Sequence, residues 1–247
     1  MTMDDELSRV FKYATDFYLK RLKLIVIFSI PFILASLLLF IVAAPTYMAL
    51  GSVFLRTGSI PELSVLDMVL AGIAYVLAVF IISDTIVNVN IVVRSKRTLT
   101  SIKREVITAL EKYATRIFYI YTLMLLLLFV VQLLLYENPL QPWLYPLIAF
   151  ILSFLLFFVP PAVVIDNSDT PTAIRRSVQM ALKNPSSIIV WTLVGLVSLS
   201  LVELVAQFIF PSPFSGYFIL LVNSLVVLPY LIVLQTQMYM EKYPLAR

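Results

Sequence analysis

The sequence predicts an all-α integral membrane protein with six transmembrane helices, arranged as three hairpins that each follow a cytoplasmic amphipathic helix. Hydrophobic residues make up 61% of the chain and charged residues 13%, which excludes an ordinary soluble protein. Six stretches reach the roughly 20 apolar residues that a membrane span needs. Basic residues gather in alternate loops, as they do in membrane proteins whose basic loops face the cytoplasm.

The first twenty residues predict an amphipathic helix and not a signal peptide, because they contain acidic residues and no apolar segment ending in a small-residue cleavage site. Polar residues on this helix include Arg9, Lys12, Asp16 and Lys20. Its apolar face repeats at helical spacing through Leu7, Val10, Phe11, Ala14, Phe17 and Tyr18.

The six predicted spans follow from the apolar stretches: Leu22–Val42, Val65–Val89, Ala114–Leu135, Leu144–Ile165, Ser187–Phe210 and Tyr217–Tyr239. Prolines within three of them predict helix kinks that free backbone carbonyls to line a cavity. These kink positions are Pro31 in the first span, Pro160 and Pro161 in the fourth, and Pro229 in the sixth.

The distribution of charge fixes the predicted orientation. With the N-terminus in the cytoplasm, every lysine and arginine except Arg56 lies on the cytoplasmic side. We therefore expect a multi-pass protein of the cell membrane with both termini in the cytoplasm.

Two further amphipathic helices are predicted, before the third and the fifth span. The first shows an apolar stripe from Leu99 to Tyr113. The second is the polar stretch "DTPTAIRRSVQMALKNP", in which Thr170 suits the N-cap, Pro171 the first helical position, and Asn184 with Pro185 the end. Its predicted apolar face consists of Ile174, Val178, Ala181 and Leu182.

These helices also suggest an internal repeat. A shift of 72 positions aligns Arg176 with Arg104 and Ala181 with Ala109. The chain would then be a single membrane domain of three units, about 1–93, 94–165 and 166–247, related by a pseudo-threefold axis and parallel in orientation because each unit holds two spans. The alternative is the chance similarity of any even-span protein with basic inner loops.

The run "VVIDNSDTPTAIRRSVQMALKNP" resembles a family of uncharacterised six-span membrane proteins. That family is related to the membrane domain attached to some bacterial glycerophosphodiester phosphodiesterases. The resemblance rests on Asp166 and Asn167 leaving the fourth span, on Ala173, Arg176 and Ser177, and on the following asparagine. It implies a membrane role and not phosphodiesterase activity, since the sequence contains no soluble phosphodiesterase domain.

Four polar residues inside the predicted spans are candidates for function, because ionisable groups in a membrane are costly. Asp84 and Asn88 lie one turn apart in the second span. Asp84 is expected either to pair with Lys20, Arg21 or Lys23, or to serve a cavity or ion path. Glu203 and Asn223 lie at similar depth in the last hairpin and are expected to meet there, as a structural contact or a functional pair.

A second group of candidates is basic and cytoplasmic: Arg9, Lys103, Arg104, Arg175 and Arg176. One interpretation is that their helices anchor on anionic lipid headgroups. The other is a shared basic vestibule that attracts an anionic ligand, a headgroup or a protein partner.

The composition argues against an enzyme. The chain has no cysteine and no histidine, and it shows no nucleophile elbow, metalloprotease motif or phosphate loop. We expect no cofactor, no metal and no nucleic-acid partner. The scarcity of thermolabile side chains favours a thermophilic source.

Two hypotheses for function remain open. One is transport or lipid handling through a cavity between the hairpins, with a basic cytoplasmic mouth. The alternative is a non-catalytic scaffold or accessory protein that docks a partner on its basic face. The partners expected are the lipid bilayer, anionic lipid included, and a protein partner or a second copy of the chain.

Overall fold

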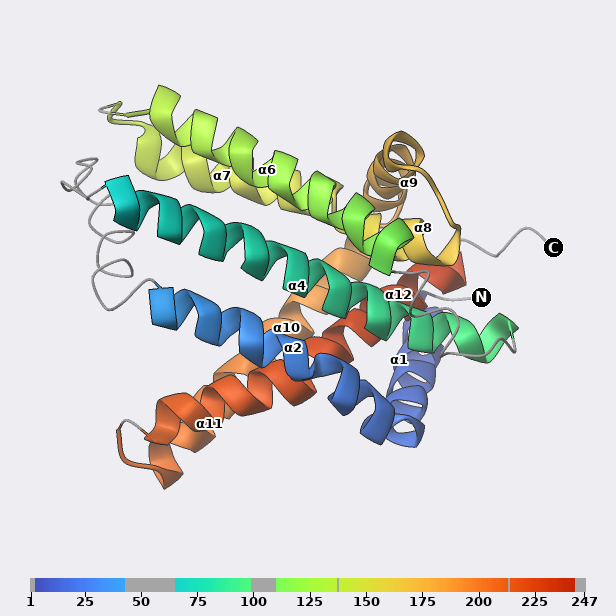
Figure 1. Ribbon diagram of the computed structural model, residues 1–247. Coiled ribbons are helices and arrows are strands. Elements are labelled where there is room, and N and C mark those ends of the chain that lie inside the picture. The colour runs from blue at the N-terminus through green and yellow to red at the C-terminus, as the bar shows by residue number, and fades with distance from the viewer. Residues whose placement is uncertain (1–2, 43–64, 99–109, 137, 213, 243–247) are drawn as a thin grey trace.

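The computed structural model describes residues 3–42, 65–98, 110–136, 138–212 and 214–242, and every regular element in these ranges is helical (Figure 1). The elements are α1 (Met3–Lys20), α2 (Leu22–Val42), α4 (Val65–Thr98), η1 (Leu110–Ala114), α6 (Thr115–Leu134), α7 (Gln141–Leu155), α8 (Val159–Ile165), α9 (Thr170–Lys183), α10 (Pro185–Ile209), α11 (Phe214–Val222), η2 (Asn223–Val227) and α12 (Leu228–Lys242). Both η1 and η2 are single π-helical turns.

Five helical stretches in these ranges are long and apolar enough to cross a membrane: Gly72–Ser95, Glu111–Leu134, Gln141–Ile165, Pro185–Ile209 and Phe214–Glu241. A sixth is present if α1 and α2 are taken together, although the two meet at an angle of 87°. The sharp bend separates the amphipathic α1 from the apolar α2. The helical class and the presence of five to six long apolar helices are therefore confirmed.

The core lies where α4, α8 and α12 come together. The C-terminal half of α4, the whole of α8 and most of α12 are buried, whereas α6 and α10 expose large apolar side chains along most of their length. Figure 1 shows α1, α9 and the last turns of α4 and α12 at one end of the bundle. We call this end the basic end, because it carries Arg9 of α1, Arg94 of α4, and Arg175 and Arg176 of α9. The turns that join α6 to α7 and α10 to α11 lie at the opposite end.

The α4 helix corrects the predicted boundary of the second span. It continues nine residues beyond Val89, to Thr98, with Asn90 and Val93 buried. The chain stays helical and buried beyond Val89 because its polar side chains there have partners inside the protein. Asn90 accepts a hydrogen bond from Thr236 of α12, and Arg94 donates to the Val164 carbonyl near the end of α8. The polar residues that follow Val89 in the sequence therefore do not mark the end of this helix.

The α9 helix has the predicted limits but a different buried face. Ala173, Ser177, Met180 and Ala181 are buried, whereas Leu182 is 64% exposed. Small residues at positions 173, 177 and 181 let α9 approach its neighbours closely. The N-cap position belongs to Asp169 and not to Thr170, and the carbonyl of Asp169 accepts the first helical hydrogen bond.

The threefold repeat stays a prediction. Amphipathic helices do precede the first and third hairpins, as α1 and α9. The helix predicted before the second hairpin falls largely on residues 99–109, which lie outside the described residues, and only η1 represents its end.

Candidate functional site

A half-enclosed cavity of about 290 Å³ lies between α2, α4, α6, α10 and α12. Its wall is largely hydrocarbon, with a tyrosine, a tryptophan, a glutamine and a serine interspersed. The lining residues are Phe32 and Ser36 of α2, Ile82 and Ile86 of α4, Tyr121 of α6, Trp191 of α10, and Leu228, Leu231, Ile232 and Gln235 of α12.

Most hydrogen-bond donors in this wall are used by the protein itself. The Ser36 hydroxyl donates to the Phe32 carbonyl at 3.0 Å, and the indole N–H of Trp191 donates to the Leu231 carbonyl at 2.7 Å. In the part of the chain that the structure describes, no hydrogen bond engages the Tyr121 hydroxyl or the amide oxygen of Gln235. The cavity therefore offers an apolar volume with one free hydroxyl and one free carbonyl oxygen.

The break between α7 and α8 explains why Gln235 is held at the cavity. Pro161 lacks the N–H that would bond to the Phe157 carbonyl in a continuous helix. The side-chain amide of Gln235 donates to that carbonyl instead. The helix is interrupted between Leu155 and Val159, just before Pro160 and Pro161, and the Phe157 carbonyl in this interruption holds a cavity residue of another helix.

Ser177 of α9 closes the same break from the other side. Its hydroxyl donates to the Leu155 carbonyl at 2.7 Å and accepts from the Phe158 backbone N–H at 3.0 Å. Ser177 is fully buried. Through Ser177, α9 is therefore hydrogen-bonded to the backbone where the helix is interrupted between α7 and α8.

The sixth span has a comparable interruption. Pro229 cannot donate to the Leu225 carbonyl, and the π-helical turn η2 immediately precedes α12. The Tyr18 hydroxyl of α1 lies 3.1 Å from the Val226 carbonyl and 3.5 Å from the Leu225 carbonyl. By contrast, α2 passes through Pro31 as one helix.

Asp166 is the centre of a polar cluster at the basic end, in the loop between α8 and α9. Its carboxylate accepts from Arg176 of α9 at 2.8 Å and from the Tyr239 hydroxyl of α12. Arg176 also donates to the Ser168 hydroxyl at 2.8 Å. The intervening Asn167 has a φ of 52°, a left-handed conformation that asparagine tolerates better than most residues.

Two more arginines hold the ends of this loop through backbone carbonyls. Arg94 of α4 donates to the Val164 carbonyl and to the Tyr113 hydroxyl, both at 2.9 Å. Arg116 of α6 donates to the Ser168 carbonyl at 2.7 Å. Four helices therefore converge on five consecutive loop and helix-end residues, 164–168.

The predicted basic candidates have different environments. Arg9 pairs with Glu241 of α12 at 3.4 Å, at the edge of a hollow of about 430 Å³, and Arg176 pairs with Asp166. Arg175 is exposed. Lys103 and Arg104 lie outside the described residues. Arg9 and Arg176 thus contribute to internal contacts, which the proposed open vestibule did not anticipate.

The environment of Asp84 differs from the predicted ion pair. Its carboxylate accepts from the Asn88 side chain at 3.0 Å, and within the described residues neither Lys20 nor a neighbouring basic residue bonds to it. Because α4 extends to Thr98, Asp84 lies about 20 Å from the end of the helix, deeper than expected. One oxygen of Asp84 and one of Asn88 are buried without a hydrogen-bond partner there.

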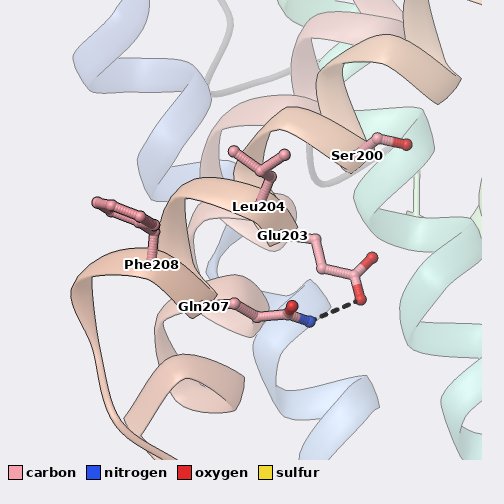
Figure 2. Close-up of a pocket in the computed structure, with 5 residues that line it drawn as sticks. All are labelled: Ser200, Glu203, Leu204, Gln207 and Phe208. Carbon is pink, nitrogen blue, oxygen red and sulfur yellow. Dashed lines mark hydrogen bonds between the residues drawn. The ribbon is translucent and has the colours of Figure 1, made fainter.

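Glu203 and Asn223 do not meet, contrary to the prediction. Glu203 is exposed on the flank of α10 and accepts from Gln207 of the same helix at 3.1 Å (Figure 2). The Asn223 side-chain oxygen is buried in η2 without a partner among the described residues. Equal depth in two spans does not fix the direction around each helix axis, and the buried side of α10 carries Gly195 and Ala206.

Sequence reasoning missed the cavity residues and most of the Asp166 cluster. Gln235 could have been noticed as a polar residue in the sixth span. Asp166 and Arg176 were noted only for the family resemblance, and not as an ion pair. Nothing in the order of residues brings Tyr239 to Asp166, 73 positions earlier.

The described residues contain no group of three or more acidic side chains that could hold a metal ion. Comparison with protein-family models, with curated proteins and with solved structures found no match for this chain.

Proposed function

We propose that this chain is a polytopic membrane protein that binds membrane lipid, with part of an acyl chain in the cavity beside Trp191. The main support for this proposal is the composition of the cavity wall, which is mostly Ile, Leu and Phe and lies between apolar helices. At about 290 Å³ it is near the lower end of ligand pockets, a size suited to part of one chain and not to a whole phospholipid.

The two free polar atoms suit an oxygen-bearing lipid group. The Tyr121 hydroxyl can donate to an ester or carboxyl oxygen, and the Gln235 amide oxygen can accept from a hydroxyl. Such contacts would set the depth of the chain, whereas the apolar wall would provide most of the binding free energy.

An ion path is less well supported. Neither Asp84 nor Glu203 lines the cavity. Asp84 lies two residues from both Ile82 and Ile86, so about 200° of helical rotation directs it away from the cavity. Lipid handling accounts for the cavity without requiring a charged group in it.

The basic end would face the cytoplasm by the distribution of lysine and arginine. There, exposed cations such as Arg175 would contact anionic headgroups, each by about 1 kcal/mol. Docking of a protein partner on this face stays the alternative. Arg9 pairs with Glu241 and Arg176 with Asp166, so fewer basic side chains are left to bind such a partner. The relation to the phosphodiesterase-linked membrane domains also stays a prediction.

Native mass spectrometry of the protein purified in mild detergent tests the proposal. We expect retained lipid on the wild type, and loss of that lipid in Ile86→Phe, which enlarges a side chain at the cavity wall. Ile189→Phe is the matched control, because Ile189 is 57% exposed on α10 and does not line the cavity. Equal lipid retention in both variants would contradict binding in the cavity.

A further inference from the structure

The exposed flank of α10 carries a polar patch formed by Ser200, Glu203 and Gln207 (Figure 2). All three side chains are exposed. They border a shallow hollow of about 400 Å³ whose lining residues, Leu204 and Phe208 included, all belong to this one helix. The described part of the chain therefore supplies no second wall.

By the length of α10, this patch would lie within the apolar depth of the membrane. The 25 residues of α10 extend about 37 Å, longer than the roughly 30 Å hydrocarbon core. Glu203 is six residues, or about 9 Å, from the end at Ile209. Centred in the bilayer, α10 would place Glu203 roughly 5 Å inside the hydrocarbon.

A lipid-facing carboxyl at that depth is unfavourable, and ionisable residues in spans nearly always face protein or water. The intramolecular bond from Gln207 satisfies one oxygen of Glu203. Among the described residues, the other carboxyl oxygen, one amide N–H and the amide oxygen of Gln207 have no partner. The patch thus combines free acceptors with a free donor.

We propose that this flank of α10 is the interface between two copies of the chain. Copies inserted in the same orientation are related by a twofold axis along the membrane normal, so each residue meets its equivalent at the same depth. The patch is complementary to itself: Gln207 of one copy can donate to Glu203 of the other, and the reverse bond follows by symmetry. Polar bonds of this kind stabilise helix pairs in membranes.

The interface can be mapped by disulfide cross-linking in the membrane, because the chain contains no cysteine. Leu196 is seven residues before Glu203, on the same flank, and is 58% exposed. Leu201 is 60% exposed but lies about 160° around the helix from Glu203. Upon oxidation, Leu196→Cys should give a species of twice the chain mass, and the control Leu201→Cys should stay monomeric.

The polar contacts are tested in the Leu196→Cys background. Adding Glu203→Leu and Gln207→Leu should weaken association roughly tenfold, whereas Glu203→Gln, which keeps a donor and an acceptor, should retain it. The proposal is overturned if Leu196→Cys stays monomeric, joins a protein of another mass, or cross-links no better than Leu201→Cys. It is also overturned if the double leucine variant cross-links unchanged.

Discussion

At the residue scale, side chains from distant elements satisfy backbone carbonyls that prolines leave without a donor. The side-chain amide of Gln235 donates to the Phe157 carbonyl freed by Pro161. The Tyr18 hydroxyl lies 3.5 Å from the Leu225 carbonyl freed by Pro229 and 3.1 Å from the neighbouring Val226 carbonyl. The prolines themselves could be found in the sequence. Their partners could not, because a proline determines which carbonyl loses its bond but not which element packs beside it.

Replacement of Ser177 by alanine should destabilise the protein. It would leave the Phe158 N–H and the Leu155 carbonyl buried without their shared partner, at a cost of about 1–3 kcal/mol. Thermal unfolding in detergent measures the effect, with the exposed Ser153→Ala as control. Equal melting temperatures for the two variants would show that Ser177 does not close the α7–α8 break.

Replacement of Tyr18 by phenylalanine should also lower the melting temperature, by the loss of a hydrogen bond of about 1 kcal/mol. Burial raises the pKa of Tyr18 from 10.0 to about 12. The neutral hydroxyl therefore contributes fully below pH 10, and its contribution is lost only as the pH rises toward 12.

The destabilisation by Tyr18→Phe should consequently be the same at pH 6 and pH 9. Tyr13→Phe, at a residue 61% exposed, serves as the control. A difference between wild type and Tyr18→Phe that disappears at pH 9 would contradict a hydroxyl that stays protonated there.

At the element scale, α9 shows how far local pattern can be used. Proline near its start and asparagine at its end gave its limits, since both act within one turn of the chain. The apolar face did not identify the face that is buried, because the helix packs through Ala173, Ser177 and Ala181 against a broken span. A search for apolar residues at helical spacing does not find Ser177, which is buried because it hydrogen-bonds to the backbone of Leu155 and Phe158.

The adjacent arginines of α9 should differ in their effect on stability. Arg176→Gln leaves the carboxylate of Asp166, whose side chain is 6% exposed, without its ion pair, and we expect a loss of about 3 kcal/mol. Arg175→Gln changes an exposed residue and should cost less than about 0.5 kcal/mol. Denaturant or thermal unfolding of the two variants measures this difference, and similar losses would contradict the role of the Asp166 cluster.

At the scale of the whole molecule, hydropathy identified the apolar helices because each needs only its own residues to be recognised. The cavity could not be predicted, because its wall takes residues from five helices spread over about 200 positions, from Phe32 to Gln235. For the same reason, the sequence could not show that neither Asp84 nor Glu203 lines this cavity. The depth of a residue along a span can be predicted from the sequence. The direction in which its side chain points around the helix axis depends on how the helices pack.

Fluorescence quenching detects directly whether an acyl chain binds beside Trp191. The chain has two tryptophans, so Trp143→Phe leaves Trp191 as the only indole. A fatty acid brominated on its chain, titrated into protein in unbrominated detergent, should quench Trp191 in a saturable manner, and Ile86→Phe should abolish the saturable part. Quenching that rises linearly with the brominated fraction, and equally in Ile86→Phe, would contradict an acyl chain in the cavity.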